Sequence, residues 1–261
     1  MEIVYGPVSS WRLGRSLGVD LICQKGKVCP FDCTYCSLGR TTELTTERRV
    51  FVPTERVARD LGEAMKKVEA DVVTFSGTGE PTLSLNLGEA IKVAKEISGL
   101  PVAVLTNSSL MNREDVRRDL AQADVVVGEL DAPNEEIFKR INRPYEEIRL
   151  ADMIEGMKKF RAGFNGKFSL EVMCAPENKD FSKEIAAIAR TIRPDEVQIN
   201  APLRSSPVRP LTPEELNAIK KDFKGMNARS VYETKKVEVK KVVGPRKLRQ
   251  LKRPKARKAG R

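Results

Sequence analysis

Three cysteines lie close together in the sequence, as Cys29, Cys33 and Cys36 of the run Cys-Pro-Phe-Asp-Cys-Thr-Tyr-Cys. Iron–sulfur clusters that only carry electrons use four cysteine ligands. Three thiolates can hold three irons of a four-iron cubane and leave the fourth iron open to a small molecule. The C-x3-C-x2-C spacing, with Tyr35 just before the last cysteine, therefore predicts an iron–sulfur site that keeps one position open.

A zinc site and a disulfide framework are the alternatives for these cysteines. Structural zinc sites usually have four Cys or His ligands, whereas this chain has no histidine and its other cysteines, Cys23 and Cys174, are isolated. Five cysteines in 261 residues are also too few for a disulfide framework. We expect Cys23 and Cys174 to be buried as small apolar side chains.

A second run with chemical potential is the turn Ser-Gly-Thr-Gly-Glu-Pro-Thr at 76–82. Its two glycines let the backbone approach a ligand closely, and Glu80 offers a carboxylate for a cationic group. The turn lacks the lysine of a phosphate-binding P-loop. The residue types therefore favour a cationic ligand at this turn.

The segments that must position these residues alternate between short apolar runs and runs with helical periodicity. Strands are expected at 18–23, 71–76, 101–106, 124–130, 167–174 and 196–201, and helices at 54–70, 87–98, 112–123, 134–141, 146–161, 180–192 and 213–223. The cysteine run follows the first expected strand, and the turn at 76–82 follows the second.

Six strand–helix units predict an α/β protein with a parallel sheet and helices outside it. Six units are two short of a closed eightfold barrel, so we expect an open, partial (β/α)6 TIM-like barrel. In such sheets ligands bind at the carboxyl ends of the strands. Polar residues that follow later strands, among them Thr106, Asn107 and Glu129, are expected at that end. Asn107 and Asp131 also fit a simpler role as helix caps.

The positive charge is concentrated at the C-terminus. The net charge is +11, and residues Lys235–Arg261 hold 13 Lys or Arg against one acid, Glu238. The first 234 residues keep 34 basic and 35 acidic residues, a balance of −1. We therefore divide the chain into a barrel domain, 1–225, and a basic extension, 226–261, which is expected to be disordered. Such a block is typical of an arm that binds nucleic acid, here RNA, although a solvated terminus has the same composition.

The N-terminal residues carry neither the basic nor the apolar region of a signal peptide. No apolar run approaches the length of a membrane span. A cytoplasmic protein without membrane contact is expected, and the reducing cytoplasm suits a cluster with an open iron.

Together these runs resemble the signature of the radical S-adenosylmethionine (radical SAM) superfamily. The resemblance implies a [4Fe-4S] cluster on Cys29, Cys33 and Cys36, with S-adenosylmethionine as cofactor and Tyr35 against its adenine. It further implies that Gly77, Thr78, Gly79 and Glu80 hold the amino group, with Thr78 in place of the usual first glycine, and that Thr106, Asn107 and Glu129 bind the ribose and methionine parts. Runs at 5–7, 12–20, 130–132, 142–144 and 171–173 resemble a branch of uncharacterised iron–sulfur oxidoreductases related to the enzyme that builds wybutosine on tRNA.

The resemblance implies reductive cleavage of S-adenosylmethionine to a 5′-deoxyadenosyl radical that takes hydrogen from a substrate. An electron donor such as ferredoxin or flavodoxin is then a partner. The basic extension favours RNA, in particular tRNA, as the substrate. The alternatives are a glycyl-radical-enzyme activase, another enzyme that modifies a protein, peptide or small molecule, and a non-catalytic iron–sulfur carrier. The wybutosine enzyme holds a second cluster on additional N-terminal cysteines, whereas only Cys23 precedes the motif here.

No catalytic acid or base is assigned by the sequence. With no histidine, such a role falls to Glu, Asp, Lys, Tyr or Cys. A substrate pocket walled by Arg140, Asn142, Arg143 and Arg204 is one hypothesis, and ordinary surface charges are the other.

Overall fold

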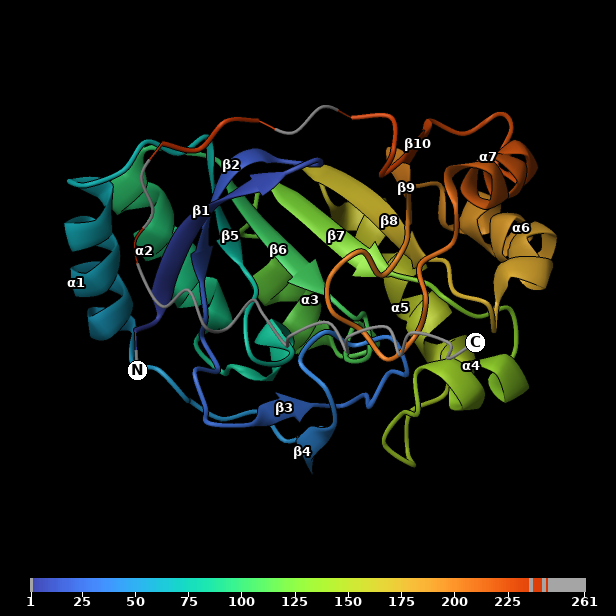
Figure 1. Cartoon of the computed structure of the whole chain (residues 1–261). Helices are drawn as coiled ribbons and strands as arrows, with labels where there is room; N and C mark the ends of the chain where they lie inside the picture. Colours follow the sequence, from blue (N-terminus) through green and yellow to red (C-terminus); the bar gives the residue numbers. More distant parts are fainter. Residues whose placement is uncertain (1, 235–236, 241–242, 244–261) are drawn as a thin grey trace, which may run out of the picture.

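The computed structural model describes residues 2–234, 237–240 and 243. Its strands are β1 (Val4–Ser10), β2 (Gly14–Val19), β3 (Lys27–Cys29), β4 (Thr41–Leu44), β5 (Val72–Phe75), β6 (Val102–Thr106), β7 (Val125–Glu129), β8 (Lys167–Met173), β9 (Glu196–Asn200) and β10 (Ala228–Ser230). Over these residues one sheet has eight strands in the order β1-β2-β5-β6-β7-β8-β9-β10, and β3 pairs with β4 apart from it (Figure 1).

The sheet is parallel from β2 to β10, and β1 alone is antiparallel to its neighbour β2. Six strands of this sheet, β2, β5, β6, β7, β8 and β9, are each followed in the chain by a helix before the next strand of the sheet begins. A parallel neighbour requires a crossover connection, which these helices provide. The expectation of a partial (β/α)6 barrel is therefore confirmed.

The helices lie outside the curved sheet, with α1 and α2 near one end and α6 and α7 near the other (Figure 1). They turn an apolar face toward the strands, as in α1, whose Val57, Leu61 and Ala64 are buried. The segments are α1 (Thr54–Met65), α2 (Leu87–Ser98), α3 (Glu114–Leu120), α4 (Glu135–Ile141), α5 (Leu150–Gly163), α6 (Ser182–Ile192) and α7 (Pro213–Asp222), with short 3₁₀ turns η1 (Pro81–Leu83) and η2 (Lys179–Phe181).

The expected first strand at 18–23 is wrong in position. The strand is β2 and ends at Val19 because the buried side chain of Asp20 accepts the backbone N–H groups of Ile22 (3.0 Å) and Cys23 (2.9 Å), which turns the chain. A strand that sequence reasoning did not predict, β1, forms a hairpin with β2. The tip of this hairpin carries Arg12, which pairs with Glu171 on β8.

Helix boundaries differ from the expected ones at several ends. The expected helix at 54–70 stops at Met65, and the one expected at 146–161 starts only at Leu150. Residues 142–149 instead form a loop, and this loop and the end of α4 lie against the cysteine run. The N–H groups of Asp32 and Thr34 in that run donate to the carbonyls of Asn142 and Ile141 respectively.

The sheet continues past the expected domain boundary at residue 225. Strand β10 pairs with β9, and Val243 exchanges two backbone hydrogen bonds with Gly6 of β1, at 2.9 and 2.6 Å. Most of the basic tail, Lys235–Arg261, lies outside the described residues. Within the described part of the chain, no helix is long and apolar enough to span a bilayer.

Candidate active site

Backbone pairing places the cysteine run directly beside the Thr-Gly-Glu turn. The N–H of Val28 donates to the Thr78 carbonyl (3.3 Å), and the N–H of Glu80 donates to the Val28 carbonyl (3.1 Å). Because Val28 immediately precedes Cys29, this pairing fixes the first cysteine next to Glu80. The two runs therefore form one site at the carboxyl ends of β2 and β5.

Close packing explains why glycine stands at two positions of this turn. A Cβ on Gly79 would lie 1.9 Å from the Val28 carbonyl oxygen, which is a backbone atom and cannot swing aside. A Cβ on Gly77 would lie 2.2 Å from Cγ of Asp20. Glycine at both positions is thus a packing requirement of this site.

The side chain of Asp20 fixes the conformation of this turn through hydrogen bonds. One of its carboxylate oxygens accepts the Thr78 N–H (3.0 Å) and the Thr78 hydroxyl (2.8 Å). The other oxygen accepts the N–H groups that turn the chain after β2. Thr78, which replaces the first glycine of the related motif, therefore uses its hydroxyl to fix the turn. Sequence reasoning missed Asp20 because it lay inside an expected strand.

Glu80 is buried and hydrogen-bonded on both carboxylate oxygens. Its Oε1 accepts the N–H and the hydroxyl of Thr82, at 3.1 and 2.7 Å, and the hydroxyl of Thr106 at 2.6 Å. Its Oε2 accepts a single hydrogen bond, from the N–H of Asn107 at 2.7 Å. Burial raises the pKa of Glu80, and these donors oppose the rise. The carboxylate is held in a fixed orientation, with acceptor capacity left on Oε2.

Asn107 joins the two halves of the site. Its backbone N–H donates to Glu80, and its side-chain Nδ2 donates to Cys29 Sγ at 3.4 Å. Its Oδ1 accepts the N–H of Ser109 at 3.0 Å and closes a local turn, but the helix-cap role considered for Asn107 is wrong, because Arg113 is the N-cap of α3. Asn107 therefore closes a turn and contacts a cysteine at the same time.

The sulfurs lie in a largely enclosed region around one lysine. Burial raises the pKa of the Cys29 thiol to about 12 and that of Cys33 well above its ordinary value. Burial by itself lowers the pKa of Lys27, but the sulfurs of Cys29, Cys36 and Cys33 raise it above the ordinary value. One ammonium group thus faces all three cysteines. In the sequence, Lys27 is indistinguishable from a surface lysine such as Lys25.

Tyr35, the aromatic residue just before the last cysteine, is buried, and its hydroxyl points at the residues that follow β7. The Tyr35 hydroxyl donates to Asp131, which also accepts Asn142 Nδ2 (2.9 Å) and the Met173 N–H (2.8 Å). Asn142 Nδ2 lies 3.7 Å from Cys33 Sγ as well. The helix-cap role considered for Asp131 is wrong, because Asn134 caps α4 by accepting the Ile137 N–H.

Glu129 and Arg12 are two further titratable residues of the site. Burial, and then Asp131 and Glu80, raise the pKa of Glu129 to about 8. Among the described residues, no hydrogen bond or ion pair to its half-buried carboxylate is formed. Arg12 is bound to Glu171, whose other oxygen accepts Asn200 Nδ2 at 2.6 Å. The contact between Arg12 and Glu171 thereby joins the tip of the β1–β2 hairpin to strand β8.

The four residues considered as a substrate wall make separate contacts. Asn142 faces the sulfurs, whereas Arg143 is exposed and lies within 3.9 Å of Asp32. Arg140 donates to the Glu177 carbonyl. Arg204 is exposed. Burial of Arg12, and then the positive charge of Arg204, lower the pKa of Arg12 to about 10.

The donor set fits a cubane better than a single metal ion. In the part of the chain that the structure describes, no three His, Cys, Asp or Glu side chains are placed to share one metal ion. In a cubane each thiolate binds a different iron, so its three cysteines need not converge on one point. Cys23 and Cys174 are buried, as expected, and stand apart as free thiols.

Comparison with known proteins identifies the family. The radical SAM superfamily model matches residues 24–192, which contain the cysteine run, the Thr-Gly-Glu turn and the elements from β3 to α6. The chain belongs to the radical SAM superfamily. Membership implies an enzyme with a [4Fe-4S] cluster and S-adenosylmethionine, and the three cysteines and the open Oε2 of Glu80 suit these two groups.

Two relatives and two solved structures illustrate the likeness. A UPF0026 protein of Synechocystis is 40% identical over 208 residues, which are 78% of this chain and 77% of the relative. A UPF0026 protein of Methanocaldococcus jannaschii is 36% identical over 227 residues, 85% of this chain and 70% of the relative. A radical SAM methyltransferase from Sphaerobacter thermophilus has a TM-score of 0.57 at 18% identity, covering 82% of this chain and 65% of its own. Archaeal TYW1 has a TM-score of 0.55 at 15% identity, covering 79% and 70%. The last two likenesses concern the fold.

Proposed function

We propose that this radical SAM protein is an RNA-modifying enzyme that removes a hydrogen atom from a nucleotide of tRNA. When bound, the [4Fe-4S] cluster and S-adenosylmethionine supply the 5′-deoxyadenosyl radical for this step. The observation that carries the chemistry is the link made by Asn107, which donates to Glu80 Oε2 and to Cys29 Sγ. Asn107 thus connects a proposed cluster ligand with the carboxylate proposed for the cofactor, in addition to the Val28–Glu80 backbone pair.

The chain's own residues supply binding, orientation and exclusion of water. Cys29, Cys33 and Cys36 are the cluster ligands in this proposal. Glu80 Oε2 accepts the ammonium of S-adenosylmethionine, since this oxygen has one hydrogen bond and room for another. Glu129 is the candidate for contact with the ribose, because its carboxylate is unpaired among the described residues and lies at the end of β7. Tyr35 remains the candidate for contact with the adenine.

Anaerobic reconstitution tests the chemistry. The full chain loaded with iron and sulfide should bind about four irons, and the reduced protein should release 5′-deoxyadenosine from S-adenosylmethionine. Deuterium from labelled tRNA should enter the 5′-deoxyadenosine if tRNA is the substrate. Protein purified without air that holds stoichiometric zinc and no iron would contradict the proposal.

RNA is favoured as the substrate class by the basic tail. The tail has no aromatic residue after Tyr232, so stacking contributes little and phosphate contacts dominate. If it neutralises about five phosphates on single-stranded RNA, log affinity should fall with log salt at a slope of about −3.5. Specificity is then left to the barrel.

A truncation tests the tail. The shortened chain should end at Val243, because this keeps the Val243–Gly6 backbone pair on β1 while removing nine of the 13 basic tail residues. The truncated chain should bind tRNA more weakly and with a shallower salt slope than the full chain. Equal affinities and equal slopes would argue for a peptide or small-molecule substrate, as for an activase.

A further inference from the structure

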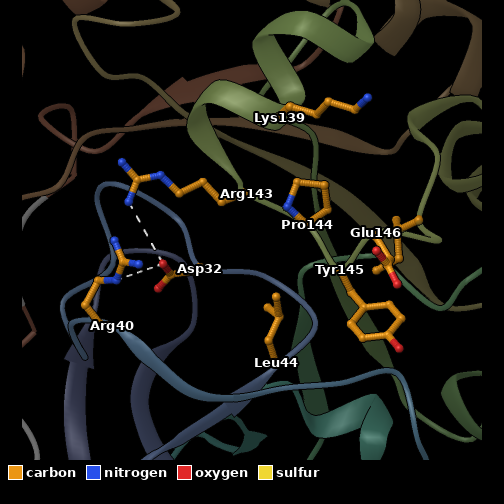
Figure 2. Close-up of a pocket in the computed structure, with 9 residues that line it drawn as sticks. Asp32, Arg40, Leu44, Lys139, Arg143, Pro144, Tyr145 and Glu146 are labelled. Carbon is orange, nitrogen blue, oxygen red and sulfur yellow. Dashed lines mark ion pairs between the residues drawn. The ribbon is translucent and has the colours of Figure 1, made fainter.

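A cavity of about 370 Å³ lies beside the cysteine run, and Asp32 of that run, but not Glu80, is among its lining residues (Figure 2). Asp32, Arg40 and Leu44 form one wall, and Lys139 with five residues between 143 and 148 forms the other. The two walls are joined by backbone hydrogen bonds, among them Tyr145 N–H to the Pro30 carbonyl (2.7 Å) and Asp32 N–H to the Asn142 carbonyl (3.0 Å). Asp32, which lines the cavity, is the neighbour of Cys33 in the sequence, so the cavity lies next to the peptide that carries one of the three cysteines.

The rim of the cavity carries an excess of positive charge. Arg40 and Arg143 both point at Asp32, with Nε–Oδ2 and Nη1–Oδ2 distances of 3.0 and 3.9 Å (Figure 2). The Asp32 side chain is only 11% exposed, whereas those of Arg40 and Arg143 are 80% and 46% exposed. Lys139 is exposed on the same rim and forms no ion pair with the described residues. Even with Glu146 counted, three cations stand against two acids.

The floor of the cavity is apolar. Leu44, a large side chain that is 42% exposed, lines it together with Tyr145 and Ile148. An apolar centre with a charged rim is the usual composition of a transient protein interface. Tyr145, the aromatic side chain among the lining residues, is half-buried, so the cavity offers little surface for stacking of nucleic-acid bases.

We propose that this cavity and its basic rim are the docking face for an acidic one-electron donor protein, such as a flavodoxin. This inference rests on the proposed function, in which the cysteine site must be reduced. The reduced donor loses one electron, the cluster gains it, and no atom is transferred. Opposite charges across the interface accelerate encounter and orient the donor, and docking here brings its prosthetic group to the peptide that carries Cys33. The cofactor side of the site stays free for S-adenosylmethionine and substrate.

Binding of an oxidised flavodoxin of known acidic surface tests the proposal on the full-length, reconstituted protein. Lys139→Glu reverses one positive charge of the rim and leaves the ion pairs of Asp32 intact. The double variant combines Lys139→Glu with Arg40→Gln, which removes a second positive charge. Lys92→Glu, on the exposed face of α2, is the control with the same change in net charge as Lys139→Glu. The double variant should raise the Kd about tenfold at low ionic strength, and high salt should abolish the difference. Lys92→Glu should leave the Kd unchanged.

The rate of cluster reduction separates docking from other effects. Reduced flavodoxin should reduce the double variant about tenfold more slowly at low salt, whereas dithionite should reduce variant and parent equally. An unchanged Kd, an equal effect of Lys92→Glu, or an equal slowing with dithionite would overturn the proposal. Weakened tRNA binding with normal flavodoxin binding would also overturn it and assign the rim to RNA. Because the Kd is measured without turnover, it remains informative even if no tRNA modification is found.

Discussion

Replacing Gly79 by Ala should destabilise the site far more than a glycine-to-alanine change usually does. The added Cβ would stand 1.9 Å from the Val28 carbonyl oxygen, and real Cβ contacts essentially never fall under 3.0 Å. The cysteine run and the turn must therefore separate by at least about 1.1 Å. That movement breaks the 3.1 Å hydrogen bond from Glu80 N–H to Val28 and strains the 3.3 Å bond from Val28 N–H to Thr78.

The cost follows from these two bonds. Each contributes about 1 kcal/mol net, and a buried group left without a partner costs about 1–3 kcal/mol. A loss of about 3–5 kcal/mol in the free energy of unfolding is expected, with weaker iron retention because Cys29 moves with Val28. Urea unfolding of the iron-free chain, followed by circular dichroism, measures the first effect, and iron content after reconstitution measures the second.

Gly62→Ala is the matched control. Gly62 lies inside α1, where an added Cβ meets nothing closer than Ile97 Cγ2 at 3.9 Å. Alanine should stabilise this helix by up to about 1 kcal/mol. The reasoning fails if Gly79→Ala unfolds within about 0.5 kcal/mol of the parent, which is the range of an ordinary surface substitution.

Three further predictions follow from the site. Cys33→Ala should abolish iron binding, whereas Cys174→Ala should leave it intact; iron analysis after anaerobic reconstitution decides, and equal iron content would contradict the ligand assignment. Glu80→Gln should lower the stability of the iron-free chain by about 1–3 kcal/mol, because each carboxylate oxygen faces a backbone N–H and the amide NH₂ must oppose one of them; an unchanged urea midpoint would refute this. The folded-state pKa of Glu129, about 8, exceeds the ordinary 4.5, so its contribution to the stability of the iron-free chain is present below pH 4.5 and is lost as pH rises to 8. The free energy of unfolding of Glu129→Gln should therefore rise relative to that of the parent as pH increases, by about 2 kcal/mol at pH 8 after solvent screening. A difference that does not depend on pH would refute the assignment.

The sequence predicted the location of the site because both runs follow strands of one parallel sheet. The carboxyl ends of such strands share an edge, so Cys29 and Glu80 had to be neighbours. The contact of Asn107 with Cys29 could not be predicted, since it depends on side-chain directions across three segments. Lys27 gave no signal, because its environment alone distinguishes it from other lysines.

The hairpin of β1 and β2 was missed for a local reason. Gly6 and Pro7 interrupt the apolar alternation of the first ten residues, and Ser9 and Ser10 resemble a loop. The shift of the first strand has a similar origin: Leu21 and Ile22 continue the apolar run of β2, but Asp20 turns the chain before them. Apolar residues in a buried turn cannot be told from a strand by periodicity alone.

The contact between Arg12 and Glu171 has a consequence for biosynthesis. Its partners are 159 positions apart in the chain, so a ribosome must complete β8 before the N-terminal hairpin can reach its final place. Closing so long a loop is entropically unfavourable until other contacts have formed, and folds with many distant contacts form slowly. Strand β2 can pair with β5 early, but Arg12 at the hairpin tip must remain without this partner while most of the barrel is translated. The hairpin is therefore expected to dock in two stages, its base before its tip.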